Sequence, residues 1–184
     1  MKSPNRIVLF FASIIVLTLS YFLDDKINNL FQSPKNIYLS LLFSVITNIG
    51  VLIVVMIVIP SIMARGKRKK AIVMLVASFL ASFVLSFVIK VLIVRPRPNF
   101  ADYPVMHALD YSFPSMHAMM AFSLLPVLIS SFPRQKIFWI VFAFLVAFSR
   151  IYLGFHYFSD VIFGAFCGLL IGSITLYFGK NASK

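Results

Sequence analysis

Three short groups of charged and polar residues stand out in the second half of the chain. They are Lys90 with Arg97-Pro98, then Pro114-Ser115-Met116-His117, then Ser149-Arg150 with His156 and Asp160. Together they supply three cations, a hydroxyl group at an expected helix start and two histidines. Phosphoryl transfer needs positive groups around the phosphate oxygens, a nucleophile and an acid. The residue types therefore predict a phosphate site.

The second group is expected to open a helix. Serine is a favoured N-cap, and the first helical turn offers unpaired N–H groups and the positive end of the dipole to a phosphate. Plain capping is the alternative role for Ser115, and phosphate binding does not exclude it. His117 lies in the same turn, where an imidazole can transfer a proton near neutral pH. A structural histidine is the alternative.

In the third group, His156 and Asp160 are four residues apart, so the carboxylate can reach the imidazole across one helical turn. A carboxylate on one ring nitrogen fixes the tautomer and makes the other nitrogen more basic. The alternative is an Asp160 helix cap beside a surface histidine. Arg150 and Lys90 lie just inside apolar segments, where a charge is costly, although Lys90 could serve as an interfacial anchor.

The sequence contains no carboxylate cluster typical of a Mg²⁺ or Zn²⁺ site. We therefore expect a mechanism without a metal or another cofactor. The site residues themselves must then supply the positive charge, the nucleophile and the acid.

The composition indicates an integral membrane protein, because 61% of the 184 residues are hydrophobic and only 12% are charged. A spanning helix needs about 20 apolar residues, and six segments qualify: 7–23, 37–62, 71–94, 114–132, 137–154 and 161–178. We predict an all-α, six-transmembrane-helix bundle that forms a single domain over residues 1–184.

The net charge of +12 suggests nucleic-acid binding at first sight, but the distribution of the charges favours a membrane orientation. Eleven of the 17 lysines and arginines gather at both termini and in the second and fourth loops, which fall on one side of a six-span chain. The positive-inside rule makes that side the cytoplasm. The N- and C-termini are then cytoplasmic, the three polar groups face the extracytoplasmic side of the plasma membrane, and no nucleic-acid partner is expected.

Two longer connections are expected on the outer side. Residues 24–36 are polar and predict a surface loop or interfacial turn. Residues 95–113 follow a helix that should end near Val94, because the residue before a proline avoids the helical region. Three residues of this connection have no assigned role: Tyr103, His107 and Asp110.

The last apolar segment has a row of small residues at four-residue spacing: Gly164, Gly168 and Gly172. Such rows let two helix backbones approach closely. Packing against a helix of the same chain is the interpretation we favour, and a dimer seam is the alternative.

The three groups resemble, in order and spacing, the motifs of the type 2 phosphatidic acid phosphatase (PAP2) superfamily. Its pattern Lys-x6-Arg-Pro matches Lys90 to Arg97-Pro98, Pro-Ser-Gly-His matches residues 114–117, and Ser-Arg-x5-His-x3-Asp matches residues 149–160. The motif region is 90–160. Met116 is the departure, since the family pattern has glycine there. Methionine still offers its backbone N–H to a phosphate, and its side chain either points away or narrows the pocket.

The resemblance implies a role for each matched residue. His156 would attack phosphorus and form a phosphohistidine, with Asp160 orienting it. His117 would protonate the leaving oxygen and later activate water. The remaining matched residues would form the phosphate-binding set: Lys90, Arg97, Ser115, Met116 and Arg150.

The function implied is that of a membrane lipid phosphatase acting at the outer leaflet, with a lipid phosphate as substrate and membrane lipids as surroundings. A polyprenyl diphosphate such as the undecaprenyl carrier is favoured, and phosphatidylglycerol phosphate is the next candidate. Two rivals stay open. One is a lipid phosphotransferase on the same scaffold, and the other is a non-catalytic lipid-binding membrane protein.

Overall fold

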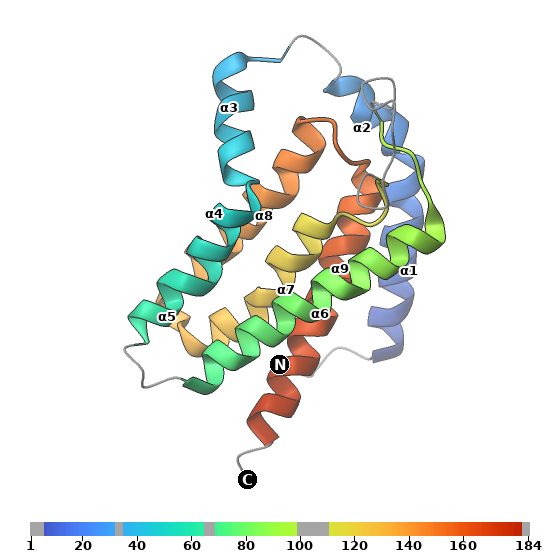
Figure 1. Cartoon of the computed structure of the whole chain (residues 1–184). Helices are drawn as coiled ribbons and strands as arrows, with labels where there is room; N and C mark the ends of the chain where they lie inside the picture. Colours follow the sequence, from blue (N-terminus) through green and yellow to red (C-terminus); the bar gives the residue numbers. More distant parts are fainter. Residues whose placement is uncertain (1–5, 32–34, 65–68, 99–110, 182–184) are drawn as a thin grey trace.

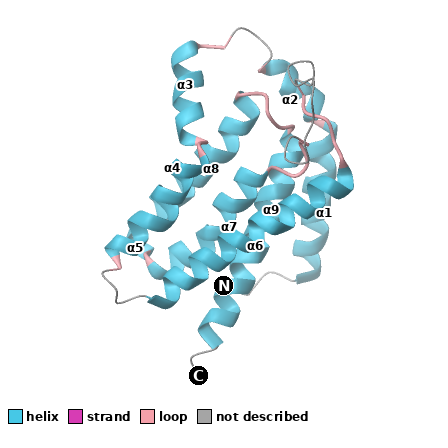
Figure 2. Cartoon of the chain, viewed as in Figure 1, coloured by secondary structure: helices cyan, strands magenta, loops and turns pink. Residues whose placement is uncertain are grey.

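A computed structural model describes residues 6–31, 35–64, 69–98 and 111–181. These residues form helices joined by loops and turns, and they contain no strand (Figure 2). The expected all-α fold is thereby confirmed for the described part of the chain. The helices are α1 (Arg6–Phe22), α2 (Asp24–Leu30), α3 (Ile37–Ile46), α4 (Ile49–Ile53), the π-helical turn η1 (Val54–Val58), α5 (Ile59–Met63), α6 (Lys69–Ile93), α7 (Met116–Ser131), the 3-10 turn η4 (Pro133–Gln135), α8 (Lys136–Tyr152) and α9 (Phe158–Asn181).

Within the described ranges, three helical segments are long and apolar enough to cross a membrane: α6, η4 with α8, and α9. The stretch from α3 through α5 is bent by 52° at the break between α3 and α4 and would make a fourth as one broken span. The described part of α1 and all of α7 are apolar but shorter. The six-span count and the cytoplasmic termini therefore stay predictions.

The short helix α7 forms the centre of the molecule (Figure 1). It contacts α6, α8 and α9, and most of its residues are buried, including Leu124 and Leu128. A helix that is apolar on all sides is expected in an interior. Its 16 residues span about 24 Å, less than the roughly 30 Å hydrocarbon core. Burial within the bundle therefore fits α7 better than exposure to lipid.

The glycine row of α9 packs against α7 of the same chain. All three glycines are buried. A Cβ added at Gly164 would lie 2.6 Å from the carbonyl oxygen of Ser115, and one at Gly168 would overlap the carbonyl oxygen of Met119. The absence of side chains thus sets how closely the two helices approach, and it brings the start of α9 against the start of α7.

The connection after α1 differs from the expected surface loop or interfacial turn, because residues 24–30 form helix α2. Asp24 and Asp25 lie in its first turn, where negative charge interacts favourably with the helix dipole. Asp25 is exposed, whereas Asp24 is buried and bonded to the start of α9. Helix α6 ends at Ile93, close to the expected end near Val94, and the backbone of Val94 has a φ of 52°.

We predict that Gly168→Ala lowers the free energy of unfolding by about 1–3 kcal/mol, because the added methyl group overpacks a backbone-to-backbone contact. Gly179→Ala is the matched control, since the atoms nearest to its Cβ would belong to the flexible side chain of Met74 and not to a backbone. Thermal unfolding of both variants in detergent measures the difference. Equal melting temperatures for the two would show that the α7–α9 contact is not limited by these backbones.

Candidate active site

The three polar groups of the sequence meet at one end of the bundle. The loop after α6, the start of α7 and the loop between α8 and α9 lie together there (Figure 1). A cavity of about 230 Å³ forms between them, lined by Ile49, Phe83, Lys90, Arg97, Met116, His117, Arg150 and His156. Residues far apart in the sequence are thus assembled around a space large enough for a phosphate group.

The cations in the cavity wall are held in place by neighbouring groups. Lys90 is only 2% exposed, and its Nζ donates to the carbonyl oxygen of Tyr111, so it is not an interfacial anchor. Arg150 Nη1 donates to Thr47 Oγ1 at 2.9 Å. The guanidinium groups of Arg150 and Arg97 lie 4.5 and 5.5 Å from the ring centre of Phe155, a distance at which cation–π attraction operates.

Ser115 begins α7 as expected but does not cap it with its side chain. Its Oγ is buried and has no hydrogen-bond partner among the described residues. A buried hydroxyl normally has a partner, so Ser115 Oγ is available to a ligand. The backbone N–H of Ser115 donates to the carbonyl oxygen of Asp160 at 3.1 Å. This bond joins the second polar group directly to the third.

The surroundings of His156 differ in one respect from the spacing-based expectation. His156 lies in the loop before α9, and its Nδ1 is 3.6 Å from Asp160 Oδ2, too far for a hydrogen bond. Its hydrogen-bond partner is the carbonyl oxygen of Ser112, at 2.7 Å. A carbonyl only accepts, so Nδ1 carries the proton and Nε2 keeps a free lone pair. The Ser112 carbonyl, and not the expected Asp160 carboxylate, therefore fixes the tautomer.

The electrostatic surroundings keep this imidazole neutral. Burial lowers the pKa of His156 well below its ordinary value, and the positive charges of Arg150, Lys90 and Arg97 lower it further. The hydrogen bond to Ser112 acts in the opposite direction. A neutral imidazole with a free Nε2 is the form that can act as a nucleophile.

Several residues that support the site were missed by the sequence analysis. Thr47, at the break between α3 and α4, holds Arg150, and Ser112 holds His156. Asp24 and Arg95 bond to the start of α9. The position of Arg95 between Lys90 and Arg97 was a signal that could have indicated a role in the site. Nothing in the sequence distinguishes Asp24 from Asp25. Tyr103, His107 and Asp110 lie outside the described residues.

Across the described ranges, no group of three or more His, Cys, Asp or Glu side chains is arranged to hold a metal ion. The charged residues of the cavity wall are instead lysine and arginine. Their cationic side chains are suited to phosphate oxygens.

Comparison with known proteins identifies a family. The sequence model of the PAP2 superfamily matches residues 71–184. Phosphatidylglycerophosphatase B of Bacillus subtilis is 36% identical over 107 residues, which are 52% of each protein. Lipid A 4'-phosphatase of Bacteroides thetaiotaomicron is 32% identical over 91 residues, 44% of this chain and 40% of that protein. The matches thus span about half the length of these curated relatives or less.

A solved structure resembles almost the whole chain. The crystal structure of a transmembrane PAP2 type phosphatidylglycerolphosphate phosphatase from Bacillus subtilis has a TM-score of 0.74 and 26% sequence identity. The similarity covers 95% of this chain and 96% of that one. It therefore includes the helices before residue 71, which the family match does not reach.

We predict that Ser115→Ala leaves the melting temperature unchanged, because no capping bond is lost, while it weakens binding of vanadate, a phosphate mimic. Loss of one hydrogen bond to an anion should raise the dissociation constant about 10- to 100-fold. Asn36→Ala is the control for sensitivity, since the Asn36 side chain caps α3 and its loss should cost about 1 kcal/mol. Destabilisation by Ser115→Ala with unchanged vanadate binding would assign Ser115 a structural role.

Proposed function

Because the chain belongs to the PAP2 superfamily, we propose that it is an integral membrane lipid phosphatase working through a phosphohistidine intermediate. One observation supports this most directly: three cations and two histidines line a single cavity. The buried hydroxyl of Ser115, next in the chain to Met116 of the cavity wall, has no hydrogen-bond partner among the described residues. These are the groups that phosphoryl transfer to a histidine requires, and a metal ion is not needed among them.

In the first step, the Nε2 lone pair of His156 attacks phosphorus, and the bond from phosphorus to the lipid oxygen breaks. His117 gives a proton to that oxygen, so the lipid leaves as a neutral alcohol or as a lipid with one phosphate fewer. In the second step, His117 takes a proton from water, whose oxygen attacks phosphorus. The phosphorus–nitrogen bond breaks, inorganic phosphate forms, and His156 returns to its neutral state.

The phosphate-binding set stabilises the charge on the transferring group. Lys90, Arg97 and Arg150 surround the equatorial oxygens with positive charge. Lys90 and Arg150 are buried, and a charge away from water acts more strongly on a bound anion. The Ser115 hydroxyl donates a hydrogen bond to one of these oxygens, and the first N–H groups of α7 add further hydrogen-bond donors.

The substrate is a lipid phosphate or diphosphate. Ile49 and Phe83 give the cavity an apolar side, which suits the part of a lipid next to its phosphate. We favour a polyprenyl diphosphate, because the described residues that line the compact cavity offer no polar side chain beyond the phosphate-binding set and the two histidines. The names of the relatives support phosphatidylglycerol phosphate as the second candidate. The positive-inside rule supports a site on the extracytoplasmic side.

The test is phosphate release by the purified protein in detergent, with EDTA present and no lipid acceptor added. The substrates are undecaprenyl diphosphate, phosphatidylglycerol phosphate, phosphatidate and lipid A. Wild-type protein should release phosphate from at least one of them. His156→Ala and His117→Ala should each lose at least about 100-fold in kcat, because each removes a group that makes or breaks a bond.

Arg134→Ala is the matched control, since Arg134 is exposed at the other end of the bundle and should keep full activity. Full activity in either histidine variant would contradict the mechanism, and inhibition by EDTA would contradict its independence of metals. Lipid binding without phosphate release would favour the non-catalytic alternative. Release only on addition of a lipid acceptor would favour the phosphotransferase.

Met116 allows a separate prediction about substrate fit. It is buried in the cavity wall, where the family pattern has glycine. We expect Met116→Gly to keep kcat within about tenfold, because the backbone N–H is retained, and to change the ranking of KM among the four lipids because the cavity widens. Steady-state kinetics on each lipid measures both values. A rise in kcat of several orders of magnitude would mean that methionine blocks the reaction.

A further inference from the structure

Arg95 lies beside the cavity and joins two buried carboxylates. Its Nη1 is 2.6 Å from Asp160 Oδ1, and its Nη2 is 2.8 Å from Asp24 Oδ2. Asp24 is 4% exposed and Asp160 is fully buried. A buried carboxylate is costly unless it is paired, so the single guanidinium compensates two such charges at once.

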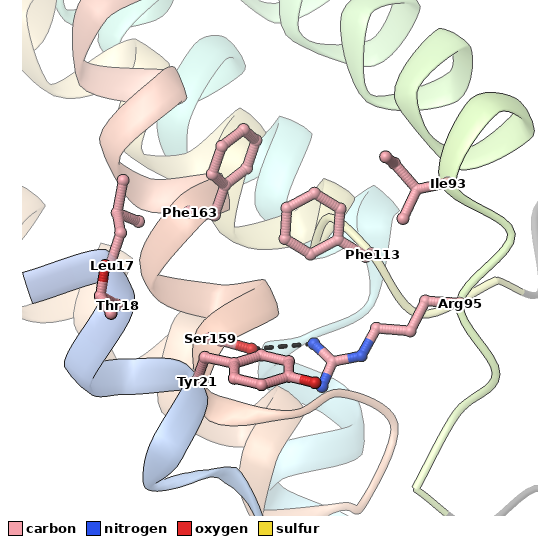
Figure 3. Close-up of a pocket in the computed structure, with 8 residues that line it drawn as sticks. All are labelled: Leu17, Thr18, Tyr21, Ile93, Arg95, Phe113, Ser159 and Phe163. Atoms are coloured by element: carbon pink, nitrogen blue, oxygen red, sulfur yellow. Dashed lines mark hydrogen bonds between the residues drawn. The ribbon is translucent and has the colours of Figure 1, made fainter. Parts of the chain in front are cut away.

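Ser159 and two aromatic rings complete the arrangement. Ser159 Oγ accepts from Arg95 Nη1 at 2.8 Å and donates to Asp24 Oδ2 at 2.5 Å, while its backbone N–H donates to Asp24 Oδ1 at 2.8 Å. The guanidinium lies 4.1 Å from the ring centre of Tyr157 and 5.6 Å from that of Tyr21. Figure 3 shows Arg95 reaching Ser159 with Tyr21 beside it. The guanidinium is thus fixed on several sides.

Arg95 also controls both groups that face Nδ1 of His156. Its side chain holds Asp160, whose other oxygen, Oδ2, lies 3.6 Å from that nitrogen and accepts from the Tyr157 backbone N–H at 2.9 Å. Its backbone carbonyl accepts from the Ser112 N–H at 2.8 Å, and the Ser112 carbonyl contacts the same nitrogen. One residue therefore sets the position of both the carbonyl and the carboxylate next to the imidazole.

Arg95 does this without lining the catalytic cavity. Its side chain instead borders a separate apolar pocket of about 450 Å³ between α1, α6 and α9, with Phe113 and Phe163 in its wall (Figure 3). Its charge is engaged by the two carboxylates. The geometry therefore does not support a role for Arg95 in binding the substrate phosphate.

We propose that Arg95, Asp24, Ser159 and Asp160 form a clamp that positions His156 for attack on phosphorus. The proposal rests on the proposed function, and it makes Arg95 and Asp24 positioning residues. It also gives the segment before residue 71, outside the family match, a part in positioning the nucleophile, since Asp24 at the start of α2 supplies one side of the clamp.

The kinetics of Arg95→Ala, Arg95→Lys and Asp24→Asn test the clamp, using the best lipid from the substrate screen. Misplacing a nucleophile by about 1 Å can cost about 100-fold. We expect kcat to fall about 10- to 100-fold in Arg95→Ala and Asp24→Asn while KM stays within about threefold, because the phosphate ligands are untouched. Arg95→Lys should recover part of kcat, since it restores one charge. Asp25→Asn, the exposed neighbour, should match wild type.

A double-mutant cycle separates positioning from general support of the fold. If Arg95 acts through Asp160, adding Arg95→Ala to Asp160→Asn should lower kcat by less than about threefold further. Multiplicative losses, a loss confined to KM, or wild-type kinetics in Arg95→Ala would each overturn the clamp. Failure of both Arg95→Lys and Asp24→Asn to yield folded protein by gel filtration would also overturn it, in favour of a folding role. A wild-type protein inactive on all four lipids would instead refute the proposed function.

Discussion

The close contact between α7 and α9 is the constraint on which the site depends. The two helices touch backbone to backbone along the glycine row, beginning at Gly164 beside the carbonyl of Ser115. At the same end, the Ser115 N–H is bonded to the carbonyl of Asp160. The proposed acid and the loop that carries the proposed nucleophile come from these two helix starts. Their separation is thus set by the backbone, which is stiffer than any pair of side chains.

A second constraint is the cost of charge at the end of a largely apolar bundle. The molecule divides its charges between two neighbouring places. The cavity wall has Lys90, Arg97 and Arg150, and no carboxylate is among the described residues that line it. The clamp has one arginine between Asp24 and Asp160. The cavity is therefore cationic and suited to a phosphate carrying several negative charges, while the carboxylates are held outside it by their own cation.

The sequence predicted the parts of this site that depend on short spacing. Apolar runs located the long helices to within a few residues, and the three polar groups were found because each is compact in the chain. Thr47 and Asp24 could not be found this way, since they contact residues 103 and 135 positions away. Whether these two residues reach the site depends on how α2 and the α3–α4 break pack against the other helices. The exposed Asp25 has the same side chain as the buried Asp24, so residue type does not separate them. The helix α2 was missed because seven mostly polar residues show no clear apolar period.

The distances around His156 assign different roles to Ser112 and Asp160 in the proposed mechanism. The Ser112 carbonyl at 2.7 Å fixes the tautomer, and this requires no charge. Attack on phosphorus leaves the ring of His156 positively charged, and the Asp160 carboxylate at 3.6 Å then stabilises that charge through space. Before substrate binds, the cavity cations favour the neutral ring, which keeps the nucleophile unprotonated. When a phosphate brings its negative charge into the cavity, the balance shifts, and a positive ring becomes less costly in the step that creates it. The same cations thus protect the nucleophile in the empty site and stabilise the phosphate during transfer.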